Sequence, residues 1–118
     1  MHKFSFTREN KLLKRFDFVR LSKTGVKIKS QLFIAAFHNG QFEKTRLGIT
    51  VTRSVGCAVT RNRIKRLTRE YFRLNKHKII GNWDINIIAK KKASTASAAQ
   101  TFSSLENLFD KIARQFDH

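Results

Sequence analysis

The chain has 118 residues, a formal net charge of +17 at pH 7 and 41% hydrophobic residues. This length fits one domain with one hydrophobic core, and the hydrophobic content excludes a disordered polyelectrolyte. So much positive charge opposes compaction and indicates a polyanionic partner, with nucleic acid favoured over an anionic membrane surface. We therefore expect residues 1–118 to form a single nucleic-acid-binding domain.

Cysteine content and hydropathy bear on the cellular compartment. Cys57 is the single cysteine, which excludes an internal disulfide and a cysteine-based zinc site, and we expect it to be a small apolar filler. The first ten residues lack the apolar segment of a secretory signal, and no apolar run approaches the roughly 18 residues of a membrane span. We expect a cytoplasmic protein that has no membrane partner.

Residues 11–23, KLLKRFDFVRLSK, predict a short amphipathic helix that ends before Gly25. Its apolar positions are spaced mostly by three or four residues. They are Leu12, Leu13, Phe16 and Val19, with Phe18 at the edge.

The next segment predicts extended structure and a turn. Residues 26–38, VKIKSQLFIAAFH, alternate apolar residues with lysine and then become continuously apolar, which indicates extended chain leading into a buried strand. The Asn39-Gly40 pair favours a hairpin turn, and apolar residues alternate again over residues 46–52. We expect residues 46–52 to form the antiparallel partner of the preceding strand.

Three further segments complete the pattern. Residues 83–89, WDINIIA, are enriched in β-branched and aromatic residues and predict a strand. Residues 93–100, ASTASAAQ, are small and polar, which is typical of a mobile loop or of the lead-in to a helix. Residues 102–116 predict a closing helix. Its apolar stripe consists of Leu105, Leu108, Phe109, Ile112 and Phe116.

The segment from Val59 to Lys78 is the most strongly charged, with eight Lys or Arg residues and a single acid, Glu70. Plotted as a helix, it has an apolar side made of Ile64, Leu67, Tyr71 and Leu74. The opposite side consists of Arg61, Asn62, Lys65, Arg66, Arg69 and Arg73, and Arg63 lies near the apolar edge. Phe72 projects among the basic residues, where its ring could stack on a base or cover neighbouring strand residues.

A run of charge on a helix is usually a solvated face, but this run differs in composition. Arg61, Lys65 and Arg69 are spaced by four with no acid between them, and such like-charged pairs destabilise a helix by a few tenths of a kcal/mol each. Arginine also outnumbers lysine, and its planar guanidinium binds phosphate in a bidentate manner. We predict that this side of the helix contacts nucleic acid.

Residues 48–73, GITVTRSVGCAVTRNRIKRLTREYFR, closely resemble the signature of the protein subunit of bacterial ribonuclease P. The family's Arg-Asn-Arg element corresponds to Arg61, Asn62 and Arg63, followed by Lys65, Arg66, Arg69 and Glu70 at the family's spacing. Residues 15–25 are similar to the family's first helix and residues 83–90 to its last strand. The resemblance therefore extends over nearly the whole chain.

The resemblance implies an α+β fold, the ribosomal S5 domain 2-like two-layer sandwich. Its element order is α-β-β-β-α-β-α, with a left-handed crossover through the basic helix. It also implies that the chain is a subunit of an endoribonuclease, in which a catalytic RNA removes the 5′ leader from precursor tRNA and this subunit assists. The expected partners are that RNA and precursor tRNA. No catalytic residue and no tightly bound cofactor are expected in the protein, and Mg²⁺ would enter the holoenzyme through the RNA.

The resemblance also implies two sets of site residues. The basic helix, with Arg61, Asn62, Arg63, Lys65, Arg66, Arg69 and Arg73, would dock on the catalytic RNA. Phe18 and Arg53 would contact the single-stranded leader in a cleft between the first helix and the sheet. Family members often have an aromatic residue where this chain has Ser22, tyrosine where it has Ala36, and a second basic residue where it has Ser54. We therefore expect weaker stacking on the leader.

The sequence offers no autonomous catalytic site. Its eight acids are dispersed, whereas a two-metal nuclease needs several carboxylates that converge on the ions. His38 lies at a predicted turn and His77 near a helix end, so we expect both to be exposed and chemically inert. One alternative stays open, a basic structural RNA-binding protein of the ribosome with no role in cleavage. A DNA-binding helix-turn-helix protein fits less well, because the basic helix lies between strands.

Overall fold

The computed structural model describes residues 15–39, 45–79 and 82–116. In chain order the elements are α1 (Arg15–Thr24), β1 (Val26–Lys29), β2 (Phe33–Asn39), β3 (Arg46–Thr50), α2 (Ala58–Asn75), β4 (Trp83–Ala89) and α3 (Ala98–Phe116). Two short 3-10 helices, η2 (Lys76–Lys78) and η3 (Lys91–Thr95), follow α2 and β4. This order confirms the predicted fold class.

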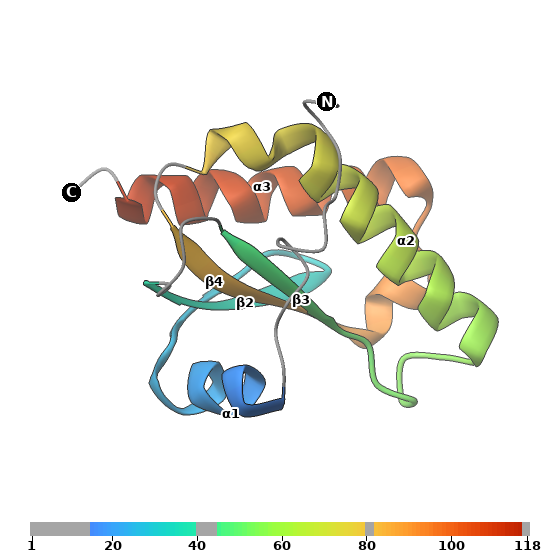
Figure 1. Cartoon of the computed structure of the whole chain (residues 1–118). Helices are drawn as coiled ribbons and strands as arrows, with labels where there is room; N and C mark the ends of the chain where they lie inside the picture. Colours follow the sequence, from blue (N-terminus) through green and yellow to red (C-terminus); the bar gives the residue numbers. More distant parts are fainter. Residues whose placement is uncertain (1–14, 40–44, 80–81, 117–118) are drawn as a thin grey trace, which may run out of the picture.

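The strands form one sheet in the order β1-β2-β4-β3. Helices α2 and α3 cover one face of the sheet, and among the described elements α1 is the helix on the other face (Figure 1). Within the described residues, no helix combines the length and the hydrophobicity of a membrane span.

The predicted hairpin between residues 26–38 and 46–52 is wrong. β4 lies between β2 and β3, and β3 pairs with β4 in parallel. The reason is burial: Ile85 and Ile87 of β4 are both 0% exposed, so β4 belongs at the centre of the sheet with a hydrogen-bonded neighbour on each side. Parallel strands need a crossover connection, and α2 supplies it, as the resemblance implied. Gly40 of the predicted turn lies outside the described residues.

The hydrophobic core fills the space between the sheet and the pair α2 and α3. The apolar stripe predicted for α3 is confirmed for Leu105, Leu108, Phe109 and Ile112, each at most 1% exposed, while the Phe116 side chain lies outside the described part. Phe109 makes edge-to-face contacts with Tyr71 and Phe72, at ring-centroid distances of 5.2 and 6.2 Å. These contacts join α3 to α2.

The buried side of α2 is rotated relative to the prediction. Ile64 and Tyr71 are buried as expected, but Phe72 is 0% exposed and Leu74 is 38% exposed. The helix packs against α3, so its buried sector is shifted toward Thr68 and Phe72. Phe72 therefore covers core residues and cannot stack on a base.

The apolar stripe predicted for α1 is also wrong. Phe16 is 72% and Val19 46% exposed, whereas Asp17 and Leu21 are buried. The surface beneath α1 is partly ionic, because Arg46 and Asp84 lie there, and so an aspartate rather than a phenylalanine turns inward. Leu12 and Leu13 lie outside the described residues.

The segment after β4 contains the short helix η3 before Ala96 and the start of α3 after it. η3 occupies residues 91–95 and α3 begins at Ala98, which agrees with the predicted lead-in to a helix. Ser97 Oγ accepts a hydrogen bond from the Gln100 amide, and Gln100 Oε1 accepts one from the Ser97 amide. This reciprocal capping box starts α3 at Ala98, four residues before the predicted start.

Candidate nucleic-acid interface

The outer side of α2 presents most of the basic residues predicted to bind nucleic acid. Asn62, Arg66 and Arg69 are exposed, and the others are partly buried on the flanks of the helix: Arg61, Arg63, Lys65 and Arg73. The helix begins after Cys57, whose carbonyl accepts a hydrogen bond from the Arg61 amide at 2.9 Å. The Arg61 guanidinium also donates, from Nε, to the Gly56 carbonyl at 3.1 Å. The first turn of α2 is thus tied to the loop before it.

Arg73 differs from the rest of this set because a carboxylate binds it. Its guanidinium donates to both carboxylate oxygens of Glu70, one helical turn earlier. The hydrogen bond from Arg73 lowers the pKa of Glu70, and the same bond raises the pKa of Arg73. Part of the positive charge at this end of α2 is therefore compensated within the helix.

A groove of about 610 Å³ lies between α1 and the sheet. Residues of four elements line it: Phe18, Val19, Ser22 and Lys23 of α1, Ile49 and Thr50 of β3 with Val51 after it, Asn86 and Ile88 of β4, and Lys65 of α2. In its floor the Thr50 hydroxyl donates to Asn86 Oδ1 at 3.0 Å. An aromatic ring, hydrogen-bonding side chains and two lysines in one groove suit a single strand of nucleic acid, whose bases stack while its phosphates meet cations.

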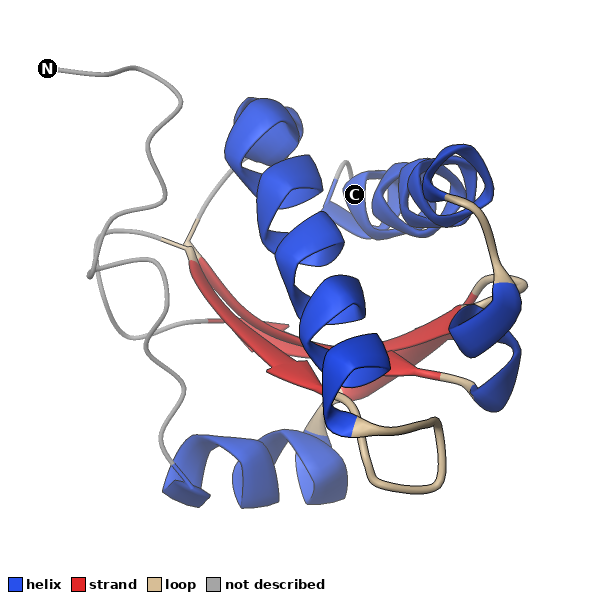
Figure 2. Ribbon diagram, turned by 90° about the vertical axis from the view of Figure 1, so that its right-hand side faces the viewer, coloured by secondary structure: helices blue, strands red, loops and turns tan. Residues whose placement is uncertain are grey.

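The two residues predicted to contact the leader lie in different parts of the structure. Phe18 lines the groove itself. Arg53 is exposed in the loop between β3 and α2, which begins at the groove residue Val51. This loop extends below the sheet, on the side where α1 lies (Figure 2). Ser22 is in the groove lining, whereas Ala36 is buried at 1% exposure and is not part of it.

Lys65 connects the groove with the basic side of α2. It belongs to the predicted basic side of the helix, and its side chain also lines the groove. The two predicted surfaces are therefore continuous across the edge of the sheet. The sequence placed Lys65 on the helix correctly but gave no indication that it reaches the groove, because that contact depends on how α2 lies over β3.

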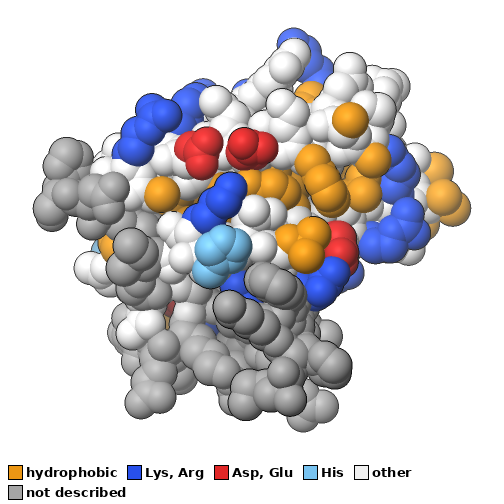
Figure 3. Space-filling model, turned by 90° about the horizontal axis from the view of Figure 1, so that it is seen from above, with side chains coloured by type: hydrophobic (Ala, Val, Ile, Leu, Met, Phe, Trp, Pro, Cys, Tyr) orange, Lys and Arg blue, Asp and Glu red, His pale blue; other side chains and the backbone are white. Residues whose placement is uncertain are grey.

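Among the described residues, none of the acids lines the groove. Among the described acids, Asp17 and Asp84 are buried, while Glu70, Glu106 and Asp110 reach the solvent from α2 and α3. Figure 3, which views the face formed by these two helices, shows acidic side chains beside a strip of hydrophobic ones. Lys and Arg side chains also lie on this face, so the exposed acids reduce its positive charge locally, whereas both charged residues in the described lining of the groove, Lys23 and Lys65, are cations.

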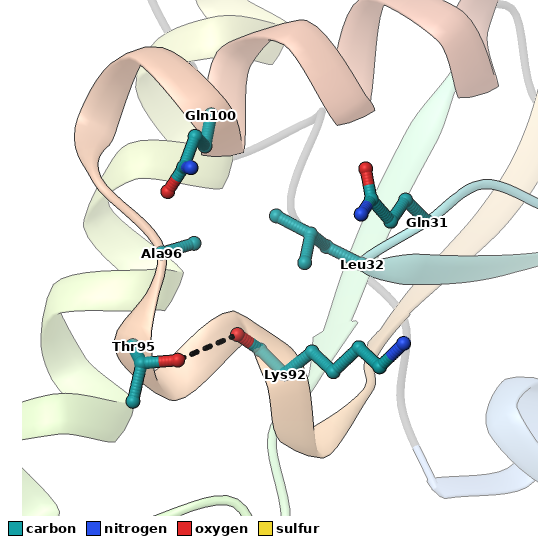
Figure 4. Close-up of a pocket in the computed structure, with 6 residues that line it drawn as sticks. All are labelled: Gln31, Leu32, Lys92, Thr95, Ala96 and Gln100. Atoms are coloured by element: carbon teal, nitrogen blue, oxygen red, sulfur yellow. Dashed lines mark hydrogen bonds between the residues drawn. The ribbon is translucent and has the colours of Figure 1, made fainter.

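A second hollow, of about 290 Å³, lies between η3, the start of α3 and the chain before β2. Its lining is mostly neutral, with Gln31, Leu32, Thr95, Ala96 and Gln100 around a single cation, Lys92 (Figure 4). The Lys90 ammonium nearby donates to the Ser30 carbonyl at 2.8 Å. The hollow does not continue the basic surface.

Asp17 and Asp84 are not dispersed, as the sequence suggested, but converge beneath α1. Both carboxylates bind Arg46, at 3.0 Å for Asp17 and at 2.8 and 2.7 Å for Asp84. The hydrogen bond to Asp84 is the main cause that raises the pKa of Arg46. Within the described ranges, no three His, Cys, Asp or Glu side chains are grouped as metal ligands.

Cys57 is not the apolar filler that we predicted, because it is exposed. It is the residue before α2, and its Sγ lies 3.5 Å from Thr60 Oγ1. The hydrogen bond with Thr60 lowers the pKa of the thiol. His38 and His77 are exposed, as expected.

The fold and the two continuous basic surfaces define a small α+β protein of the nucleic-acid-binding class. The sequence profile described as Ribonuclease P matches residues 6–113. The chain therefore belongs to the ribonuclease P protein family.

Known proteins from several bacteria are similar over almost the full length. The chain is 47% identical to the ribonuclease P protein component of Desulfosudis oleivorans over 98% of this chain and 96% of that protein. The protein component from Desulfatibacillum aliphaticivorans is 45% identical, and both chains are covered completely.

Two solved structures share the fold. The ribonuclease P protein of Staphylococcus aureus superposes with a TM-score of 0.80 at 35% identity, over 85% of this chain and 92% of that chain. The Thermotoga maritima ribonuclease P protein gives 0.79 at 34% identity, over 87% and 97%.

Proposed function

We infer that this chain is the protein subunit of a bacterial ribonuclease P, the endoribonuclease that removes the 5′ leader of precursor tRNA through its catalytic RNA. The observation that supports this inference best is the continuity of the groove with the basic side of α2 through Lys65. One small domain can then contact two RNA molecules at once. Its action would take place in the cytoplasm.

On the catalytic RNA, the outer side of α2 is the proposed contact. Exposed Arg66 and Arg69, together with Arg61 and Arg63 on the flanks, present guanidinium groups that can bind phosphates in a bidentate manner. Asn62 adds a neutral donor and acceptor between them. Such contacts position the protein on RNA without requiring a particular base sequence.

On the substrate, the groove is the proposed site for the single-stranded leader. The Phe18 ring offers a stacking surface, Thr50 and Asn86 offer hydrogen bonds, and Lys23 offers a cation for a phosphate. Arg53 extends the positive charge along the loop after β3. Cations between two polyanions reduce their mutual repulsion, so the protein would assist by holding the substrate near the catalytic RNA.

The chemistry of cleavage is assigned to the RNA. Mg²⁺ would be bound by the RNA in the holoenzyme, and the protein would hold no tightly bound cofactor. The protein would then contribute electrostatic attraction of phosphates and positioning of the substrate. With about six phosphate contacts, the logarithm of affinity for RNA should fall with the logarithm of salt concentration with a slope of about −4 to −5.

Reconstitution with a bacterial ribonuclease P RNA tests the proposal. At low magnesium, added protein should stimulate removal of the 5′ leader. In a binding titration, Arg63→Ala should weaken association with the catalytic RNA more than Lys92→Ala, because Lys92 belongs to η3 and lines the mostly neutral second hollow, not the outer side of α2. No stimulation, or equal losses in the two variants, would contradict the proposal. Copurification with ribosomal RNA, and leader removal that persists in cells without the protein, would support the ribosomal alternative instead.

A further inference from the structure

Four charged side chains form an ion cluster between α1 and the sheet: Asp17 and Arg20 of α1, Arg46 of β3 and Asp84 of β4. Three of them are buried and Arg20 is partly exposed. Asp84 is 0% exposed and accepts hydrogen bonds from Arg46 and, at 2.5 Å, from Arg20 Nη2. Asp17 accepts one from Arg46 at 3.0 Å and lies 3.7 Å from Arg20. Each helix residue of the cluster therefore has a partner of opposite charge on a strand.

Helix α1 has little else to attach it to the sheet. Of its ten residues only Asp17 and Leu21 are buried, and Phe16 and Val19 turn toward solvent. The C-terminal end is held where Gly25 approaches β2: a Cβ at this position would lie 2.6 Å from the Leu21 carbonyl oxygen and 3.2 Å from that of Phe37. The first half of the helix is held by the ion cluster.

The ion cluster and the groove share the same elements. On α1, Asp17 directly precedes the groove residue Phe18. On β4, Asp84 is followed at every second position by the groove residues Asn86 and Ile88, which lie on the same face of the strand. The cluster thus lies at one end of the surface that forms the groove floor.

Ionic contacts constrain a helix differently from apolar ones. An apolar contact tolerates small displacements, whereas hydrogen-bonded charges in a buried site need correct distances and directions, because an unpaired buried charge is costly. Asp17 and Arg20 therefore constrain the lateral position of the first half of α1 over the sheet, whereas Leu21 and Gly25 hold its C-terminal end. The same position sets the separation between Phe18 and the groove floor.

We propose that the Asp17, Arg20, Arg46 and Asp84 cluster positions α1 so that the groove has the width that a single-stranded RNA leader requires. Asp17 and Arg20 are positioning residues, since they act through Phe18 and its neighbours. This proposal depends on the proposed function, because it assigns the occupant of the groove to the substrate leader.

Two variants with opposite changes of charge test the proposal. Asp17→Asn raises the net charge by one and reduces the ionic contact with Arg46 to a neutral-acceptor hydrogen bond at most. Arg20→Met lowers the net charge by one and leaves the strand pair Arg46 and Asp84 intact. Asp110→Asn on α3 and Arg15→Met at the start of α1 are matched controls, since both residues are exposed and neither is in the groove or the cluster. Each variant is assembled with the catalytic RNA after circular dichroism has verified its fold.

Affinity is measured for precursor tRNA with a long leader and with a leader of a single nucleotide. We expect Asp17→Asn and Arg20→Met both to weaken binding of the long-leader substrate by about tenfold, because small displacements of contact groups have effects of this size or larger. Binding of the short-leader substrate and of the catalytic RNA should change less than about twofold, and the controls should resemble the wild type.

Effects that follow charge, with tighter binding for Asp17→Asn and weaker binding for Arg20→Met, would overturn the proposal. Equal losses for long and short leaders would also overturn it, because they would indicate a general structural defect. If Asp17→Asn does not fold, Arg20→Met decides, since it removes only a partly exposed side chain. If the wild-type holoenzyme does not distinguish the leaders, the proposed function of the groove is wrong, which is a separate result.

Discussion

Arg46 and Asp84 occupy paired register positions on the parallel strands β3 and β4, and Asp84 accepts two hydrogen bonds from the Arg46 guanidinium, at 2.8 and 2.7 Å. The pair is almost completely buried, with side-chain exposures of 8% and 0%. Removal of one partner leaves the other buried with a single remaining ion pair among the described residues, to Asp17 for Arg46 or to Arg20 for Asp84. The two residues are therefore coupled in stability, and this coupling can be measured.

Asp84→Ala should lower the free energy of unfolding by about 3 to 5 kcal/mol, because it leaves Arg46 buried opposite a cavity. Asp110→Ala, at an exposed position of α3, should change it by less than about 0.5 kcal/mol. Urea denaturation followed by circular dichroism measures both. Similar midpoints for the two variants would show that water or other groups compensate Arg46.

The rotation of α2 predicts unequal losses of stability when two apolar residues near its C-terminal end are replaced by alanine. Phe72→Ala should destabilise the fold by about 3 to 5 kcal/mol, because the ring is fully buried against Phe109. Leu74→Ala should cost about 1 kcal/mol or less, since this side chain is 38% exposed. Thermal unfolding of the two variants distinguishes this arrangement from the predicted one, in which Leu74 is buried and the order of effects is reversed.

Tyr71 presents a buried hydroxyl that has no hydrogen-bond partner among the described residues. Tyr71→Phe should leave the free energy of unfolding unchanged or raise it by up to about 1 kcal/mol, because an unsatisfied polar atom is removed. Chemical denaturation at neutral pH measures this difference. A loss of stability would indicate a partner for the hydroxyl.

The burial of Tyr71 also predicts how the stability of the protein changes at alkaline pH. Burial raises the pKa of Tyr71 above that of an unfolded tyrosine, near 10, with a smaller contribution from Glu106 and Asp110. The neutral phenol therefore contributes stability that is present below about pH 10 and is lost as pH rises toward the folded-state pKa. Tyr71 is the single tyrosine of the chain, so phenolate absorbance reports it alone. It should titrate later in the native protein than in urea, and Tyr71→Phe should lose less stability between neutral and alkaline pH.

Cys57 provides a chemical probe of the start of α2. Its thiol is exposed and its pKa is lowered, so alkylation at neutral pH should be faster in the native protein than in the same chain unfolded in urea. Bound catalytic RNA should slow the reaction, since Cys57 directly precedes α2 and its carbonyl accepts a hydrogen bond from the amide of Arg61, a residue of the proposed contact. Undiminished alkylation in the complex would indicate that the RNA does not cover this end of the helix.

Local patterns determined much of this protein by themselves. The charge of the α2 segment, its helical spacing and the apolar stripe of α3 follow from the order of side chains along one element, and each is found in the structure. β4 is found at its predicted bounds, because its β-branched run is long and is flanked by polar residues. The resemblance supplied the order of elements and the family, and through them Phe18 as a groove residue.

Only the tertiary structure decided which elements are neighbours. The inward turn of Asp17, the burial of Phe72 and the reach of Lys65 into the groove all depend on partners more than 25 residues away in the chain or on the path of α2 over the sheet. Periodicity reports which side of a helix is apolar, but it does not report whether the opposing surface is apolar or ionic. For α1 that surface contains Arg46 and Asp84, and the free energy of pairing buried charges outweighs the exposure of Phe16.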